Sequence, residues 1–202
     1  MKVGVLALQG DVREHIKALE ECGVSPFSVR RPSEIANIDA LILPGGESTT
    51  IALLAEEFGV FDVIQNRIQK GMPVYGSCAG MILLADRVLD ATKDQKTFGG
   101  MDITVRRNAF GRQVDSFESD LHVDGITTPL MKAVFIRAPW VESVGSGVEV
   151  LASVKSPDGR EHPVAVRQGT LLATSFHPEL TGDNRIHRYF VEQVCKVEKS
   201  IK

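Results

Sequence analysis

Short, continuous apolar runs separate stretches of helical periodicity in the first half of this chain. Three of these runs cover residues 3–8, 40–43 and 73–75. A strand that is buried on both faces has this composition, whereas a strand with one solvated face alternates between apolar and polar residues. Strands of this kind belong to parallel sheets that are covered by helices on both faces. The pattern therefore predicts an α/β fold with a mostly parallel central sheet.

The segments between these runs carry helix signals. Asp11 is a candidate N-cap, Val12, Ile16 and Leu19 recur at helical spacing, and Gly23 closes the segment. Residues 79–89 are apolar all round at their centre, so this helix is expected to be central. Further helices are expected at residues 48–58 (with Ser48 as N-cap), 61–70 and 184–197.

The second half of the chain is richer in strand patterns, which predicts extra antiparallel strands beside the parallel sheet. Neither a repeat nor a linker divides the sequence, so residues 1–202 are interpreted as a single domain. The expected strands, including one from the first half, cover residues 26–29, 97–105, 115–122, 133–137, 148–154, 164–167 and 171–176.

Charge and cysteine content exclude several classes of protein. A net charge of −3 and a pI near 6.0 do not suggest a nucleic-acid or membrane-surface binder. The N-terminus lacks a signal-peptide pattern, and no apolar run approaches the roughly 18 residues of a membrane span. Cys22, Cys78 and Cys195 are far apart and form no C-x-x-C motif, which disfavours a disulfide framework or a zinc site. A cytoplasmic protein fits this pattern best.

The sequence Gly76-Ser77-Cys78-Ala79-Gly80 has the G-x-C-x-G pattern of a nucleophile elbow between a strand and a helix. The glycines allow a sharp turn, and the helix N-terminus favours a thiolate at Cys78. The N–H of Ala79 is placed to donate to a developing oxyanion. A small buried cysteine in a tight turn is the alternative. The position at a strand-to-helix junction favours a catalytic nucleophile.

A base for this nucleophile is expected from His177-Pro178-Glu179, which follows the apolar run at residues 171–176. In an extended segment residues i and i+2 share a face, so Glu179 can accept from one ring nitrogen of His177 and leave the other for Cys78. Alone, this segment would be a surface turn. Beside the elbow it predicts a Cys78–His177–Glu179 triad, because a parallel sheet gathers its site at the carboxyl ends of its strands.

A second glycine-containing loop, Pro44-Gly45-Gly46-Glu47-Ser48-Thr49, leaves a buried strand and enters a helix. Its backbone can approach a ligand, so the N–H of Gly46 is a candidate second oxyanion donor, and Glu47 could bind a substrate ammonium. An ordinary glycine turn is the alternative. No phosphate-loop or dinucleotide-binding motif occurs, and neither a cofactor nor a metal is expected.

Together these motifs resemble the class I, triad-type glutamine amidotransferases. Further segments are similar to the glutaminase subunits of pyridoxal 5'-phosphate synthases, and the resemblance covers nearly the whole chain. These segments are Leu6-Ala7-Leu8-Gln9-Gly10, Arg13-Glu14-His15, Arg107-Asn108-Ala109-Phe110-Gly111-Arg112-Gln113, Phe135-Ile136-Arg137-Ala138-Pro139 and Ser175-Phe176-His177-Pro178-Glu179-Leu180. One departure is Ser77, where the family usually has threonine.

The resemblance implies a flavodoxin-like fold and hydrolysis of L-glutamine to glutamate and ammonia through a Cys78 thioester. The ammonia would pass to a separate synthase subunit that makes pyridoxal 5'-phosphate (vitamin B6). The resemblance also implies a glutamine site, which consists of Gly46, Glu47, Ser48, Arg107, Ile136 and Arg137. An arginine suits the substrate carboxylate, although without the resemblance surface charge would be the favoured interpretation of Arg107 and Arg137.

Gln9 and Gly10 lie at the end of the first strand, where they could transmit docking of the partner subunit to the loop around Gly46. Three other functions stay open at this point. The chain could serve another ammonia-using synthase, such as the imidazole glycerol phosphate type. It could be a cysteine hydrolase of the related α/β superfamily, although those usually place a histidine just after the elbow. It could also be a catalytically silent binding subunit.

Overall fold

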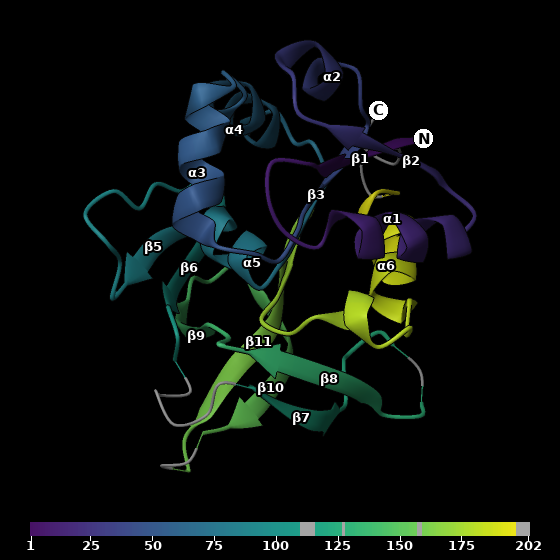
Figure 1. Ribbon diagram of the computed structural model, residues 1–202. Coiled ribbons are helices and arrows are strands. Elements are labelled where there is room, and N and C mark those ends of the chain that lie inside the picture. The colour runs from purple at the N-terminus through teal and green to yellow at the C-terminus, as the bar shows by residue number, and fades with distance from the viewer. Residues whose placement is uncertain (110–115, 127, 157–158, 197–202) are drawn as a thin grey trace.

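The computed structural model describes residues 1–109, 116–126, 128–156 and 159–196. Its centre is a seven-stranded sheet with the order β10-β11-β12-β4-β3-β1-β2 (Figure 1). Five strands of this sheet run parallel, namely β1 (Lys2–Leu6), β2 (Ser25–Val29), β3 (Ala40–Leu43), β4 (Val74–Ser77) and β12 (Leu171–Thr174). Two strands, β11 (Glu161–Gln168) and β10 (Glu149–Lys155), extend it in antiparallel fashion. The predicted α/β class, with its mostly parallel sheet and extra antiparallel strands, is confirmed.

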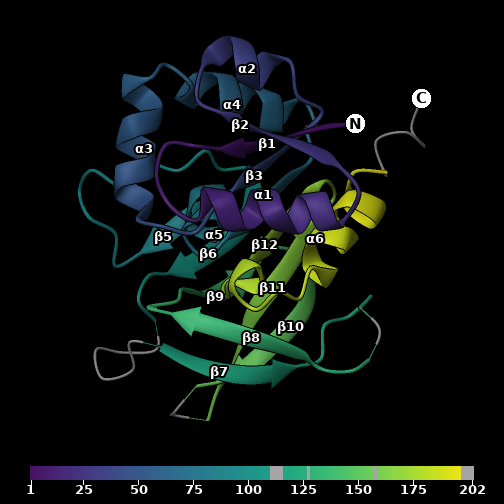
Figure 2. The ribbon, with the colours of Figure 1, turned by 45° about the vertical axis from the view of Figure 1, so that its right-hand side comes forward.

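Alternate residues of the central strands face two separate hydrophobic layers. On β3, Leu41 and Leu43 face one layer, and Ala40 and Ile42 face the other. Helices cover both faces, as Figures 1 and 2 show. The first layer includes α2 (Pro32–Ala36), α3 (Ser48–Glu57), α4 (Phe61–Gln69) and α5 (Ala79–Leu84), and the second includes α1 (Val12–Glu21), α6 (Arg185–Tyr189) and the π-helical turn η2 (Phe190–Val194).

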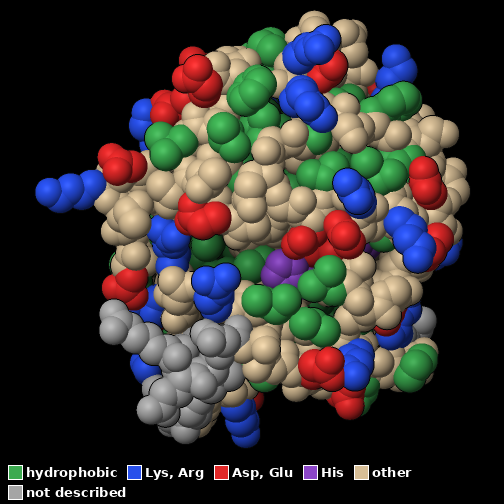
Figure 3. All heavy atoms as spheres, in the orientation of Figure 1, with side chains coloured by type: hydrophobic (Ala, Val, Ile, Leu, Met, Phe, Trp, Pro, Cys, Tyr) green, Lys and Arg blue, Asp and Glu red, His purple; other side chains and the backbone are tan. Residues whose placement is uncertain are grey.

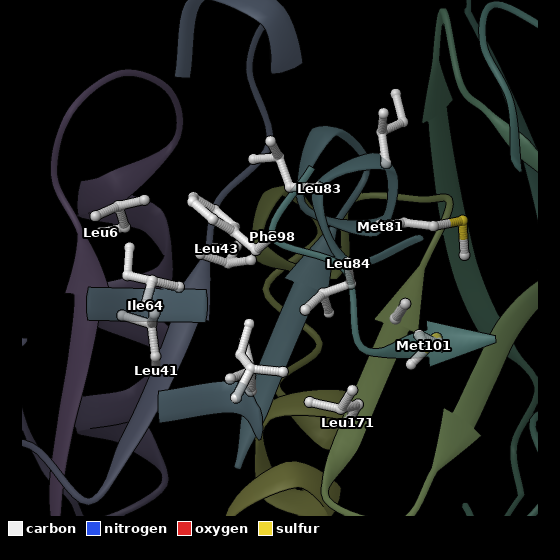
Figure 4. Close-up of a cluster of buried hydrophobic side chains, with 14 of the residues drawn as sticks. Leu6, Leu41, Leu43, Ile64, Met81, Leu83, Leu84, Phe98, Met101 and Leu171 are labelled. Carbon is white, nitrogen blue, oxygen red and sulfur yellow. The ribbon is translucent and has the colours of Figure 1, made fainter. Parts of the chain in front are cut away.

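Two smaller sheets contribute side chains to these hydrophobic layers. The strands β5 (Ala85–Leu89), β6 (Met101–Arg106) and β9 (Trp140–Val144) form one, and β7 (Ser116–Leu121) and β8 (Met131–Ile136) form the other. Met101 belongs to the same hydrophobic layer as Leu41, and Figure 4 shows side chains of β1, β3, α4, α5 and β6 that meet there. Phe135 of β8 belongs to the opposite layer. The antiparallel strands therefore extend the core beyond the parallel sheet.

Several predicted boundaries were wrong. The helix expected at residues 79–89 ends at Leu84, because residues 85–89 pair with β6 as β5. The helix expected at residues 184–197 is a short α6 followed by η2. Helix α2 and strand β9 were not expected at all. The predicted strand ends in the second half differ from the observed ones by a few residues, and positions 115 and 197 lie outside the described residues.

None of the helices within the described ranges has the length and apolar character needed to cross a bilayer.

Helix α5 lies unusually close to β3, and this contact sets the position of the elbow. A Cβ atom at Gly80 would lie 2.3 Å from the carbonyl oxygen of Leu43. Backbone cannot yield as a flexible side chain does, so only glycine fits at this position.

The variant Gly80→Ala is expected to lower the free energy of unfolding by about 3 kcal/mol, because the added methyl group overlaps the backbone of β3. Urea denaturation would measure the loss. Gly147→Ala is the matched control, since the nearest atom to its added Cβ is 3.9 Å away, and it should change the value by no more than about 0.5 kcal/mol. Equal stability of the two variants would contradict the close approach of α5 to β3.

Candidate active site

Loops that follow the carboxyl ends of four parallel strands meet at one cavity of about 420 Å³. Gln9 follows β1, Gly46 follows β3, Cys78 follows β4 and His177 follows β12. The carboxyl edge of a parallel sheet is where the loops are free to converge. On the face drawn in Figure 3, histidine shows at the surface beside acidic and hydrophobic side chains. The sheet thus gathers residues from distant parts of the sequence at a single hollow.

Cys78 occupies a strained turn between β4 and α5. Its backbone has φ 49° and ψ −99°, which is unusual for a residue with a side chain. A Cβ atom at Gly76 would lie 2.4 Å from the backbone of Gly80, so both flanking glycines are sterically required. The N–H of Cys78 donates to the carbonyl of Thr174 at 2.7 Å. This bond ties the elbow to β12, the strand that leads to His177.

His177 bonds Glu179 on one side and lines the cavity together with Cys78. Nδ1 of His177 lies 2.7 Å from Oε1 of Glu179. Because Nδ1 is occupied by the carboxylate, Nε2 is left for the sulfur. The expectation of an extended segment was wrong, since residues Pro178–Leu180 form a 3₁₀ turn, η1. That turn still carries the carboxylate to the imidazole.

The carboxylate of Glu179 has no exposed surface and is held by a second donor. The hydroxyl of Ser77 lies 3.2 Å from Oε1 and 3.3 Å from Oε2. A buried carboxylate requires such donors, because it has lost its hydration. Ser77, the residue before Cys78, therefore supports the carboxylate that bonds His177. A threonine would carry the same hydroxyl.

Asp11 is a site residue that the sequence reasoning missed. It was expected to cap α1, but its side chain makes no capping hydrogen bond. Its Oδ2 instead lies 3.5 Å from Nδ1 of His177, and it lines the cavity. One feature of the sequence could have indicated this role: Asp11 lies in the loop after β1, the same loop as Gln9.

These acidic neighbours determine the protonation of His177. Burial opposes a charge on the ring, but the hydrogen bonds with Asp11, Cys78 and Glu179, together with the negative charge of Cys78, raise the pKa of His177 to about 12. A charged imidazolium next to a sulfur favours the thiolate. His177 therefore holds a proton beside the sulfur of Cys78.

The oxyanion candidates Gly46 and Ala79 both line the cavity with Cys78. Ala79 is the first residue of α5, so no carbonyl of its own helix can accept from its N–H. Gly46 has φ 151°. Its Cα approaches Gln9 so closely that a Cβ would lie 2.4 Å from Oε1 of that side chain.

Gln9 and Gly10 contact the loop around Gly46 directly. The N–H of Glu47 donates to Oε1 of Gln9 at 2.8 Å. A Cβ atom at Gly10 would lie 1.7 Å from the carbonyl oxygen of Gly45, and the N–H of Asp11 donates to the same oxygen at 3.2 Å. Any movement of this segment must therefore move the neighbouring loop.

Glu47 and Arg107 pair with each other across the cavity. Nη2 of Arg107 lies 2.9 Å from Oε1 of Glu47. The same carboxylate caps α3 through the N–H groups of Thr49 and Thr50, and these bonds, acting against burial, lower the pKa of Glu47. The expectation that Ser48 caps α3 was wrong, because Ser48 is the first helical residue and its hydroxyl donates to Gln95 at 2.8 Å.

Ile136 and Arg137 also line the cavity, as does Asn108. Arg137 has φ 42° and Asn108 has φ 45°. Among the described residues other than glycine, four have positive φ, and three of them, Cys78 included, line this cavity. Backbone strain concentrated at one place indicates a functional site. Residues 110–113, which were part of the same sequence motif, lie outside the described residues.

Asp11, His177 and Glu179 place ligand-type atoms within 4.8 Å of one another. Two of these atoms, Nδ1 of His177 and Oε1 of Glu179, lie 2.7 Å apart, which is an ordinary hydrogen-bond distance. A shared proton explains this contact.

Comparisons with known proteins agree on one family. The model of the SNO glutamine amidotransferase family matches residues 5–196. Pyridoxal 5'-phosphate synthase subunit PdxT of Kineococcus radiotolerans is 61% identical over 194 residues, which are 95% of this chain and 94% of the relative. The PdxT subunit of a Nocardioides species is 60% identical over 96% of both chains.

Solved structures give the same result. A crystal structure of a glutamine amidotransferase has a TM-score of 0.85 and 50% identity, over 94% of this chain and 97% of that one. The structure of PurLQS from Thermotoga maritima has a TM-score of 0.64 over 99% of this chain and 96% of the matched one. Its 18% identity shows a shared fold only.

An NMR titration of the imidazole of His177 tests the electrostatics of the site. We expect the ring to stay protonated well above the ordinary imidazole pKa of about 6.5. Asp11→Asn and Cys78→Ala should each lower the pKa, because each removes a group that favours the charged ring. Titration of the unmodified protein near 6.5, or an upward shift in Asp11→Asn, would contradict this account.

Proposed function

The chain belongs to the SNO glutamine amidotransferase family, and we propose that it is the glutaminase subunit of a pyridoxal 5'-phosphate synthase. The observation that carries this function is the 2.7 Å bond between His177 and Glu179, beside a cavity of about 420 Å³ that Cys78 and His177 line together. Residues 1–202 act as one glutaminase domain in this proposal. L-Glutamine is the substrate, and the synthase subunit is the protein partner.

The reaction proceeds through a thioester. The Cys78 thiolate attacks the side-chain amide carbon of glutamine, and the carbonyl oxygen becomes an oxyanion that the N–H groups of Gly46 and Ala79 stabilise. The C–N bond breaks as His177 gives its proton to the leaving nitrogen, which departs as ammonia. Neutral His177 then takes a proton from water, whose oxygen attacks the thioester. The C–S bond breaks, and glutamate leaves.

Glu179 keeps the His177 ring in the orientation that this proton transfer needs. Its bond to Nδ1 leaves Nε2 facing the sulfur and the leaving nitrogen, and the bond strengthens when the ring is charged. A neutral side chain at position 179 would lose that charge stabilisation.

Glutamine recognition follows from the charged pair in the same cavity. The substrate carries an ammonium and a carboxylate, and Glu47 and Arg107 offer the complementary charges. Their mutual ion pair exchanges for two pairs with the substrate, so neither protein charge is left unpaired. Ser48, Ile136 and Arg137 complete the glutamine site in this proposal.

The free thiol of Cys78 must stay reduced to act, and this requirement supports a cytoplasmic location. Partner docking is assigned to the segment Gln9–Gly10, because that segment bonds the loop that carries Gly46 and Glu47. Docking there would set the oxyanion loop only when an acceptor for ammonia is present, which limits wasted hydrolysis.

Glutamate release from L-glutamine, with and without a pyridoxal 5'-phosphate synthase subunit, tests the function. We expect release that the subunit stimulates, and a loss of at least about a thousandfold in Cys78→Ala, which lacks the nucleophile. Cys22→Ala is the matched control and should retain the rate, because Cys22 lies outside the cavity. Release that depends on Cys78 but ignores this subunit would assign the chain to another synthase. No release in any mixture would overturn the glutaminase itself.

Gln9→Ala tests the docking route. Loss of the acceptor for the Glu47 N–H should reduce the ratio of stimulated to unstimulated glutamate release by about fivefold or more. Gln69→Ala, an exposed glutamine at the end of α4, is the control. An unchanged ratio in Gln9→Ala would refute the role of this segment.

A further inference from the structure

Two histidines outside the triad are buried directly behind Glu179. His15 on α1 and His187 on α6 have no exposed surface. Nδ1 of His15 lies 2.9 Å from Nε2 of His187, and Nε2 of His15 lies 3.6 Å from Oε1 of Glu179. The line Glu179–His15–His187 therefore runs from the triad into the hydrophobic layer between α1, α6 and the sheet. The glutaminase mechanism assigns no role to either histidine.

Both rings are neutral. Burial, followed by the nearby His187 and His177, lowers the pKa of His15 well below its ordinary value. Burial lowers the pKa of His187 to about 4. The ring of Tyr75 packs edge-on to both histidines, and its hydroxyl bonds Thr174 at 2.8 Å. Each imidazole thus carries one proton. The ring nitrogen that holds it decides whether an N–H or a lone pair of His15 faces Glu179.

Only one arrangement of these protons is favourable. Within the described residues, Nε2 of His15 and Nδ1 of His187 have no hydrogen-bond partner. If Nε2 of His15 carries the proton, its N–H dipole points at the carboxylate of Glu179, Nδ1 accepts from His187, and one acceptor stays unpaired. In the opposite arrangement a lone pair faces the carboxylate and a donor of His187 is buried unpaired. The first arrangement is favoured, because it avoids repulsion between a lone pair of His15 and the carboxylate of Glu179 and leaves no N–H of His187 buried without an acceptor.

Glu179 needs this support because Nδ1 of His177 has two acidic neighbours. Glu179 lies at 2.7 Å and the partly exposed Asp11 at 3.5 Å. Nε2 of His177 faces Cys78 only while Nδ1 bonds Glu179 and not Asp11. Ser77 holds the Glu179 carboxylate from one side.

Given the proposed glutaminase, we propose that His15 is a positioning residue that fixes the Glu179 carboxylate through its Nε2–H, in the tautomer that His187 imposes. At 3.6 Å the contact is longer than a hydrogen bond, so the force is that of an N–H dipole on a buried carboxylate. Low polarity around the group strengthens such a force. His15 touches neither substrate nor sulfur and acts through Glu179 alone.

Steady-state glutaminase kinetics of the complex with the synthase subunit provide the first test. His15→Leu removes the donor and should lower kcat about 10-fold with an unchanged KM for glutamine. His15→Gln places an amide donor near the same point and should retain most of kcat. His162→Leu is the control, because His162 is also buried with an unpartnered Nε2 but stacks on Trp140 outside the site. It should keep the wild-type kcat.

A tautomer measurement on the unmodified protein needs no variant to fold. Long-range ¹H–¹⁵N NMR spectra of the histidine rings should show His15 protonated at Nε2 and His187 also protonated at Nε2. A proton at Nδ1 of His15, wild-type kcat in His15→Leu, or equal losses in the leucine and glutamine variants would each overturn the role of His15. Absent glutamate release by the wild-type complex would instead refute the proposed function, and the NMR result would still decide the tautomer.

Discussion

The parallel pairing of β4 with β12 is the constraint on which the site depends. Cys78 and His177 are 99 residues apart in sequence, and the loops that carry them become neighbours only because their strands are hydrogen-bonded in register. The bond from the Cys78 N–H to Thr174 continues that ladder into the elbow. Helix α5 can start at this point because Gly80 lets it approach β3 at backbone distance. Displacement of either strand would separate Cys78 from His177.

The two acidic side chains beside His177 differ in burial. Glu179 is fully enclosed and meets Ser77 and His15, whereas Asp11 is partly exposed in the cavity. Negative charge on both sides holds the proton on the imidazole. The Glu47–Arg107 pair lines the same cavity. The acidic groups beside His177 and the Glu47–Arg107 pair thus lie on different loops, and the loop that carries Asp11 is hydrogen-bonded to the loop that carries Glu47.

Sequence reasoning worked where a motif is local and failed where distant contacts decide. The G-x-C-x-G pattern located the elbow because a Cβ atom at either glycine would clash with nearby backbone, and both glycines lie within one five-residue motif. The helix at residues 79–89 was extended too far, because the pairing of β5 with β6 overrides the local apolar pattern. Asp11 was interpreted as a cap because capping is its commonest local role, but its carboxylate bonds no N–H of α1 and lies beside the imidazole of His177.

By itself the sequence determined the α/β class, most of the alternating strands and helices of the first half, and the three residues proposed as nucleophile, base and orienting carboxylate, because these follow from hydrophobic period and from motifs of five or six residues. Only the tertiary structure decided that Asp11 joins Glu179 beside His177, that Glu47 faces Arg107, and that His15 and His187 lie in line behind Glu179. Arg107 is 60 residues from Glu47 along the chain, and His187 is 172 residues from His15. No local pattern encodes such contacts, since each joins loops or helices that only the packed fold brings together from distant parts of the sequence.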